Sequence, residues 1–187
     1  MRVAAVQATP AILDLDGCVE KIETLTRAAV ADGAQLVVLP ETFIPMYPMS
    51  RLTHSNWDPR QTDLFEQIWA NAVEAPGPVV DRLAALCREL DVHLAVGVNE
   101  REPARSGTLY NALLLIGPTG LLHKHRKLMP THHERLFHGI GNGEDLAVVE
   151  TPLGRIGGLI CWENLMPLAR YTVYRQRPQI WLAPTIG

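Results

Sequence analysis

The chain has 187 residues, of which 47% are hydrophobic and 20% charged, so it is long enough for one soluble globular domain with a sizeable core. Its formal net charge of −3 gives no reason to expect nucleic acid or an anionic membrane as a partner. Three cysteines at no metal-ligand spacing argue against a disulfide framework and for a reducing compartment.

The N-terminus is apolar only briefly, which is too short for a signal peptide, and no apolar run approaches the length of a transmembrane helix. We therefore predict a cytoplasmic protein.

Strands and helices alternate in the first and last parts of the sequence, and hairpins lie between them. The first helix is capped by Asp14 or Asp16 and closed by Gly33, and a later helix opens at Pro78. Further helices are predicted over residues 62–73 and about 167–176. The predicted strands are residues 3–8, 35–39, 93–98, 109–116, 121–127, 146–150, 155–160 and 179–183. This order predicts an α/β domain with a mixed sheet.

Two segments without periodicity stand out between these elements. Residues 43–60 contain three prolines with aromatic and methionine residues between them, and residues 129–143 are dense in histidine and glycine. Long loops inside compact domains are usually functional. Residues 43–60 are therefore a candidate for part of a site, and residues 129–143 are predicted to be a loop.

Cys161 stands where an apolar run ends and a polar, proline-containing segment begins. This pattern predicts a buried strand, a sharp turn and a helix, the geometry that presents a nucleophile above a sheet. A helix N-terminus and a nearby cation would lower the pKa of such a thiol. The alternative is a packed apolar cysteine, which is how we interpret Cys18 and Cys87, because each lies in a helical segment with no nearby base.

Glu41 and Lys127 also follow apolar strands. A glutamate at the end of a buried strand is costly to bury unless it is paired or acts as a base, whereas the lysine taken alone is better interpreted as a surface charge. Together with Cys161 they supply the base, the cation and the nucleophile that hydrolysis of a carbon–nitrogen bond requires.

Three motifs resemble those of the nitrilase superfamily of carbon–nitrogen hydrolases, in the same order and spacing. They are Leu39-Pro-Glu41-Thr-Phe43, His125-Arg-Lys127-Leu-Met-Pro130 and Leu159-Ile-Cys161-Trp-Glu-Asn164. The residues after Cys161, through Arg170, are similar to the nitrilase branch. The resemblance implies a four-layer αββα sandwich, incomplete at its C-terminal side because family domains are longer than this single-domain chain.

The resemblance also implies the roles of the residues. Glu41 would be the general base, Lys127 the electrostatic stabiliser, Cys161 the nucleophile and Glu134 a second glutamate that orients the site. A loop salt bridge of Glu134 with Arg135 or Lys127 is the alternative. The implied reaction converts a nitrile to a carboxylic acid and ammonia with no cofactor and no metal, and the family forms homo-oligomers.

Two positions depart from the family pattern in the expected substrate pocket. Met46 precedes Tyr47 where nitrilases often have glycine, and His138 stands near a position where many have tryptophan. Tyr47, Trp162 and His138 are the candidate substrate-binding residues.

Three other functions remain open. An amidase would use the same trio on an amide, and an inactive remnant would act only as an interaction partner. A zinc site among the histidines at 123, 125, 132 and 133 lacks a completing ligand pattern, so solvation or loop hydrogen bonds are preferred.

Overall fold

The computed structural model describes residues 1–48, 55, 58–102, 104 and 107–186. A five-stranded sheet has the order β1-β2-β3-β4-β5, and a three-stranded sheet has the order β6-β7-β8. The strands of the first sheet are β1 Val3–Ala5, β2 Leu36–Val38, β3 His93–Arg101, β4 Leu109–Gly117 and β5 Gly120–Arg126; those of the second are β6 Val149–Thr151, β7 Gly154–Gly158 and β8 Ile180–Leu182. Both sheets are mixed, because β1, β2 and β3 run parallel, as do β7 and β8, whereas the remaining pairs are antiparallel.

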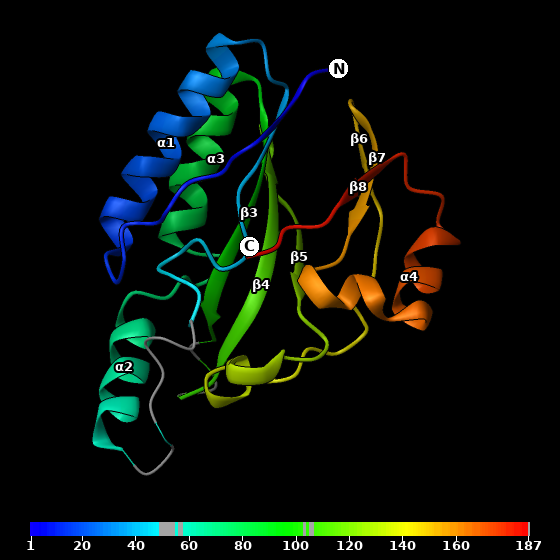
Figure 1. The fold of residues 1–187 in the computed structure, drawn as a ribbon. Helices are drawn as coiled ribbons and strands as arrows, with labels where there is room; N and C mark the ends of the chain where they lie inside the picture. The colour runs from blue at the N-terminus through cyan, green and yellow to red at the C-terminus, as the bar shows by residue number, and fades with distance from the viewer. Residues whose placement is uncertain (49–54, 56–57, 103, 105–106, 187) are drawn as a thin grey trace.

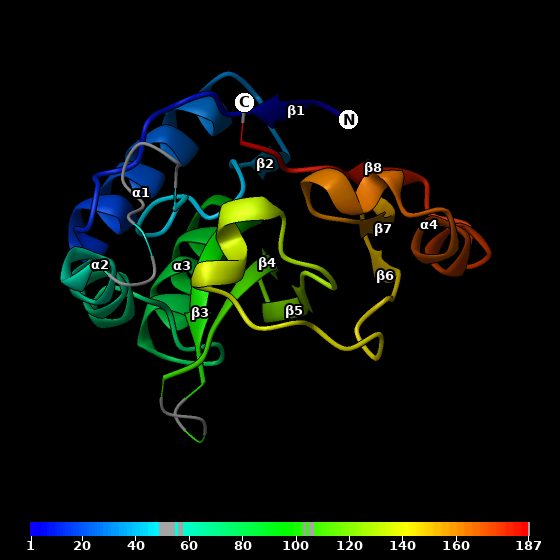
Figure 2. The same cartoon turned by 60° about the horizontal axis from the view of Figure 1, so that its bottom comes forward.

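Helices lie on the outer faces of the two sheets. Helices α1 (Leu15–Ala31) and α3 (Pro78–Leu90) cover the five-stranded sheet, and α4 (Pro167–Tyr174) lies beyond the three-stranded sheet (Figure 1). Helix α2 (Pro59–Ala70) lies at one end of the first sheet, as the turned view also shows (Figure 2). The order helix, sheet, sheet, helix is the predicted αββα arrangement.

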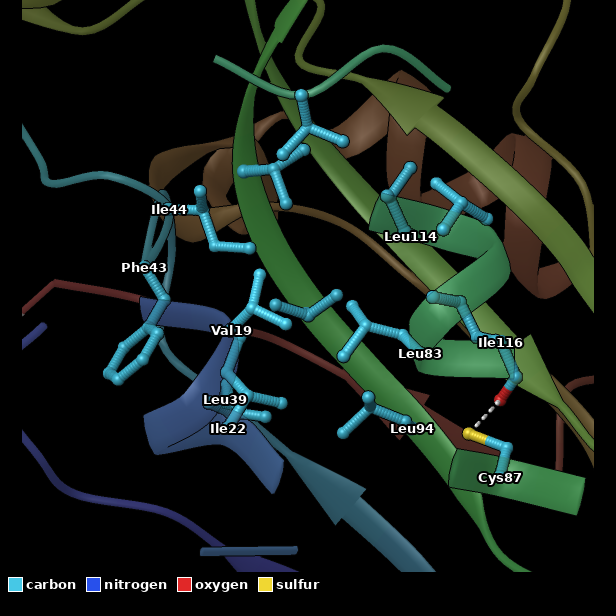
Figure 3. Packing of buried hydrophobic residues seen from close by; sticks show 14 of the residues in the cluster. Val19, Ile22, Leu39, Phe43, Ile44, Leu83, Cys87, Leu94, Leu114 and Ile116 are labelled. Atoms are coloured by element: carbon cyan, nitrogen blue, oxygen red, sulfur yellow. Dashed lines mark hydrogen bonds between the residues drawn. The ribbon is translucent and has the colours of Figure 1, made fainter. Parts of the chain in front are cut away.

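Separate apolar clusters fill the spaces between these layers. Side chains of α1 and α3 interlock with those of β3 and β4, and the Cys87 thiol donates to the Ile116 carbonyl at 3.9 Å within this cluster (Figure 3). A second cluster joins Leu36, Leu113 and Leu115 of the first sheet to Ile156 and Leu182 of the second. Because full burial of such a side chain stabilises by about 1.5–3 kcal/mol, the first cluster holds α1 and α3 on their sheet and the second holds the two sheets face to face.

Local signals account for most helix boundaries. Asp14 is the N-cap of α1 and accepts from the Gly17 amide at 2.9 Å, and Gly33 beyond the helix has φ +87°. Helix α2 starts at Pro59 rather than at the predicted residue 62. Its N-cap is Asp58, whose side chain accepts from the Arg60 amide at 3.0 Å, so the Asp-Pro pair marks the helix start and not the end of the loop.

The predicted loops and short strands differ from the structure in detail. The segment 129–143 contains a 3-10 helix, η1 (His132–Leu136), and Cys161–Leu165 form a second, η2. Strands β1, β6 and β8 have three residues each, shorter than the apolar runs that predicted them, because only part of each run pairs with a neighbour. Residues 49–54 and 56–57 of the predicted loop 43–60 lie outside the described part. No helix in the described ranges is long and apolar enough to cross a membrane.

Candidate active site

Glu41 follows the second strand and is held against the neighbouring strand β3. A Cβ on Gly97 would lie 2.4 Å from both the Pro40 carbonyl and the Thr42 amide, so only glycine allows this approach. Thr42 has φ +44°, which a non-glycine residue rarely adopts and which turns the chain directly after Glu41. The Glu41 side chain is 1% exposed. Sheet contact and turn together point this carboxylate into the protein.

Lys127 leaves the end of β5 and lies between two carboxylates. Its Nζ atom is 2.7 Å from Glu41 Oε1 and 2.7 Å from Glu134 Oε1. All three side chains are buried. Burial alone would lower the pKa of Lys127, but the two carboxylates outweigh it and raise the pKa. The lysine therefore stays an ammonium ion inside the protein.

Cys161 stands at the predicted turn between β7 and the helical segment that follows. Its φ is +50°, and its amide donates to the Pro184 carbonyl at 2.9 Å. A backbone in this region is strained for a side chain with a Cβ and persists only when the surroundings hold it. The strand, sharp turn and helix that the sequence predicted are all present, and the turn places the thiol beside Glu41.

The expected depression of the thiol pKa is wrong. Burial and the negative charge of Glu41 raise the pKa of Cys161 to about 11, and Lys127 only partly opposes them. A hydrogen bond to the Glu41 carboxylate raises the pKa further, whereas the Trp162 backbone N–H lowers it. At neutral pH the resting sulfur is thus a thiol whose proton faces a carboxylate. A thiol in this state would need a base to act as a nucleophile, and the Glu41 carboxylate is its hydrogen-bond partner.

Glu134 comes from η1, inside the segment predicted as a loop. Its carboxylate accepts from the Tyr47 hydroxyl at 2.7 Å and from Lys127 Nζ. The two interpretations of Glu134, a residue that orients the site and a salt-bridge partner of Lys127, are therefore compatible, because the salt bridge belongs to the same cluster. Burial and the hydrogen bond to Glu134 raise the pKa of Tyr47. Tyr47 is accordingly a hydroxyl donor to the cluster.

Asn111 on β4 connects the two glutamates, a role that the sequence did not reveal. Its Nδ2 donates to Glu41 Oε1 at 2.8 Å and to Glu134 Oε2 at 3.3 Å. The Ile186 amide adds a contact of 3.2 Å to Glu41 Oε2. Two signals were available: the Tyr110-Asn111 step fits the family resemblance, and a buried amide on a strand must find hydrogen-bond partners.

His138 and Trp162, which were predicted to bind substrate, lie in different environments. His138 is 6% exposed and lies behind Glu134, with Nδ1 4.0 Å from Glu134 Oε2. Trp162 is 63% exposed, and its backbone N–H donates a hydrogen bond to the Cys161 sulfur. The structure thus places Tyr47 and His138 against Glu134 and directs the Trp162 ring to the surface.

A hollow of about 550 Å³ borders Glu41 and Tyr47. Apolar side chains dominate its wall, with Val6, Ile12 and Met46 among them. Cys161 and Lys127 are not among the described residues that line it.

The histidines at 123, 125, 132 and 133 do not form one cluster of contacts in the described structure. His125 contacts Asp145 through Nδ1 at 2.9 Å and Glu163 through Nε2 at 2.9 Å. His132 and His133 pack edge to face in η1. Within the described ranges, no group of three or more histidine, cysteine, aspartate or glutamate side chains is arranged to hold a metal ion.

The sequence matches the model of the carbon-nitrogen hydrolase family over residues 2–186. The chain belongs to the carbon-nitrogen hydrolase family. Within this family it is 42% identical to a bifunctional nitrilase/nitrile hydratase of Lupinus angustifolius, over 99% of this chain and 53% of that protein. It is 41% identical to an aliphatic nitrilase of Sinorhizobium fredii, over 98% of this chain and 60% of that protein.

Solved structures of carbon-nitrogen hydrolases share the fold. The Saccharomyces cerevisiae member of branch 10 of the nitrilase superfamily superposes with a TM-score of 0.76 at 22% identity, covering 99% of this chain and 64% of that one. A carbon-nitrogen hydrolase from Helicobacter pylori gives 0.74 at 20% identity, with coverages of 99% and 60%. The recognition of the superfamily and of its layered fold is confirmed. The chain spans about half the length of the curated plant relatives that it matches.

Proposed function

We propose that this protein is a nitrilase, which hydrolyses an organic nitrile to a carboxylic acid and ammonia through a cysteine-bound intermediate. The observation that carries the proposal is the buried cluster in which Lys127 joins Glu41 and Glu134 while the Cys161 thiol contacts Glu41. The relatives at 41% and 42% identity, named as nitrilases, favour the nitrile over other substrates of the family.

The first half of the reaction forms a carbon–sulfur bond. Glu41 takes the thiol proton as Cys161 attacks the nitrile carbon, and the proton passes to the nitrile nitrogen. The Lys127 ammonium and the Trp162 backbone N–H both act on the Cys161 sulfur, and in this proposal they stabilise the negative charge that develops on the nitrogen. The product of this half is a thioimidate.

The second half uses two water molecules. Glu41 deprotonates the first water, which adds to the thioimidate carbon. The former nitrile nitrogen is then protonated and leaves as ammonia. The thioester that remains is attacked by the second water, again with Glu41 as the base. The carbon–sulfur bond breaks, the acid departs, and the proton returns to the Cys161 sulfur.

The test measures ammonia, acid and amide released from a panel of aliphatic, aryl and arylacetonitriles. We expect the wild-type protein to release ammonia and Cys161→Ala to release none. Cys87→Ala is the control and should keep the activity, because the Cys87 thiol lies outside the cluster of Glu41, Lys127 and Glu134. Amide must be measured because two activities appear in the name of the Lupinus relative. A folded wild-type protein that cleaves matched amides but no nitrile would make it an amidase, and one that cleaves neither would make it an inactive remnant.

We also propose that the protein forms homo-oligomers in the cytoplasm. Trp162, Leu165, Leu168 and Tyr171 are 63%, 70%, 80% and 67% exposed and follow one another at three-residue spacing. An exposed apolar stripe of this kind is typical of interaction surfaces. Light scattering on wild type and Leu168→Glu tests the assembly, because a monomer in both samples would contradict it.

A further inference from the structure

The backbone amides on both sides of Lys127 are held by carboxylates. The Arg126 amide donates to Asp145 Oδ2 at 2.7 Å, and the Leu128 amide donates to Glu163 Oε1 at 2.6 Å. Amides bonded to charged acceptors make short and strong hydrogen bonds. Lys127 is therefore fixed by its two neighbours as well as by its own ion pairs.

The same Glu163 also holds the turn of the nucleophile. Its Oε2 accepts from the Ile160 amide at 2.7 Å, directly before Cys161. Glu163 is 2% exposed. One buried carboxylate thus contacts the residue after Lys127 and the residue before Cys161.

His125 closes the arrangement between the two carboxylates. Burial alone would lower the pKa of His125, but its hydrogen bonds to Asp145 and Glu163 outweigh this and raise the pKa to about 9. At neutral pH the ring is an imidazolium ion that donates one N–H to each carboxylate. The free-energy cost of burying two acidic side chains is thereby offset by the cation between them.

These contacts cross from one sheet to the other. Strand β5, which carries His125 and leads to Lys127, belongs to the five-stranded sheet, whereas Cys161 follows β7 of the three-stranded sheet (Figure 1). The described strands of the two sheets share no ladder of backbone hydrogen bonds. Apolar packing holds the sheets together but does not specify a distance as narrowly as directional hydrogen bonds do.

We propose that Asp145, His125 and Glu163 form a bridging cluster that sets the position of Cys161 relative to Lys127 and Glu41. These three side chains are positioning residues, since they act through the backbone of residues 126, 128 and 160. This inference rests on the proposed function only for the identity of the substrate that the Cys161 thiol attacks. Displacement of a reacting group by about 1 Å can cost about a hundredfold in rate, so such a cluster has a large effect without contacting substrate.

The experiment has two readouts on wild type, Glu163→Gln and His125→Gln. The first is kcat and KM for the best nitrile. The second needs no substrate: it is the pH midpoint of Cys161 alkylation by iodoacetamide, followed by mass spectrometry of the Cys161 peptide. Cys18 and Cys87 are 0% exposed and give separate peptides, so they do not interfere.

We expect both variants to lose about tenfold or more in kcat with KM changed by less than about threefold. We also expect the alkylation midpoint of both to fall from about 11 toward the value of a free thiol, about 8.5. In the intact protein, burial and the charge of Glu41 raise the pKa of Cys161. A loosened turn would admit water and move the sulfur away from Glu41, so the pKa would fall.

Charge alone predicts a different result. Glu163→Gln removes a negative charge and would lower the thiol midpoint, whereas His125→Gln removes a positive charge and would raise it. Midpoints that move in opposite directions would therefore overturn the proposal. Glu100→Gln is the matched control, because Glu100 is 1% exposed and its carboxylate accepts from the side chains of Lys124 and Arg126, whereas the backbone amides of residues 126, 128 and 160 donate to Asp145 and Glu163. Its midpoint and kcat should stay at the wild-type values, and equal losses in this control would also overturn the proposal.

The two proposals fail separately. If wild type hydrolyses no nitrile but the midpoint falls in both variants, the function is wrong and the bridging cluster stands. If wild type is active and the variants keep its kcat and midpoint, the cluster is wrong. Should Glu163→Gln fail to fold, Asp145→Asn replaces it, because Asp145 is the more exposed end of the cluster, with 19% of its side chain accessible.

Discussion

His138 donates its Nε2 proton to Asn99 Oδ1 over 2.6 Å, and this contact determines which ring nitrogen faces Glu134. Asn99 Nδ2 donates to the Ile44 carbonyl at 3.0 Å and to the Met46 carbonyl at 2.8 Å, so its oxygen must accept. The unprotonated Nδ1 of His138 then lies 4.0 Å from Glu134 Oε2. The pair connects the chain segment before Tyr47 to the second glutamate of the cluster.

The buried ring predicts a loss of stability in acid. Burial lowers the pKa of His138 to about 4, although Glu134 raises it slightly. An unfolded histidine titrates near pH 6.5, so the unfolded state binds more protons between about 6.5 and about 4, and stability falls as pH falls through this range. The shift corresponds to about 3 kcal/mol. In urea unfolding at pH 7, 5.5 and 4.5, His138→Gln, which keeps a donor for Asn99, should lose less stability than wild type. Equal slopes in the two proteins would contradict the assignment.

His125 predicts the opposite dependence. Its folded-state pKa of about 9 lies above the unfolded value near 6.5, so its stabilisation is complete below about pH 6.5 and is lost as pH rises through about 9. We expect wild type to lose about 3 kcal/mol more than His125→Gln between pH 6.5 and 9.5. Chemical denaturation at these two pH values measures the difference. His93→Gln, a histidine on β3 whose pKa burial lowers, should show the wild-type alkaline slope.

Gly97→Ala should inactivate the protein. The new Cβ would lie 2.4 Å from the Pro40 carbonyl and 2.7 Å from the Glu41 Cα, and neither backbone group can move without displacing the carboxylate. We expect a loss of about 1–3 kcal/mol in the free energy of unfolding and of about a hundredfold in kcat. Gly143→Ala is the control, since its Cβ would meet only Leu146 Cδ1 at 3.8 Å. An active, stable Gly97→Ala would show that Glu41 does not need this contact.

Tyr47→Phe separates two roles of one side chain. The hydroxyl donates to the buried Glu134 at 2.7 Å, a hydrogen bond to a charged group that contributes about 1.5–3 kcal/mol. If Tyr47 orients Glu134, kcat should fall about tenfold or more with little change in KM. Steady-state kinetics compare Tyr47→Phe with Tyr174→Phe, a tyrosine on α4 that is 42% exposed and whose hydroxyl accepts from the Arg170 side chain. A rise in KM alone would instead support the substrate-binding role predicted from the sequence.

Much of the fold was predictable from local signals. Asp14 capped the first helix, Pro78 opened the third, and the apolar runs before Glu41 and Cys161 are strands or strand ends. The lengths of β1 and β8 were not, because pairing depends on a neighbour that a sequence window does not contain. The start of α2 was missed because Asp58 and Pro59 suit a turn as well as a helix N-terminus.

By itself, the sequence determined that Glu41, Lys127 and Cys161 stand at the ends of apolar strands and are candidates for the chemistry, and the family resemblance added Glu134. Only the tertiary structure decided how they act on one another. It paired Lys127 with both glutamates, raised rather than lowered the pKa of Cys161, and joined the two sheets through Glu163. The reason is physical: burial and electrostatic coupling depend on distances between segments far apart in the chain, and these distances exist only after the layers pack.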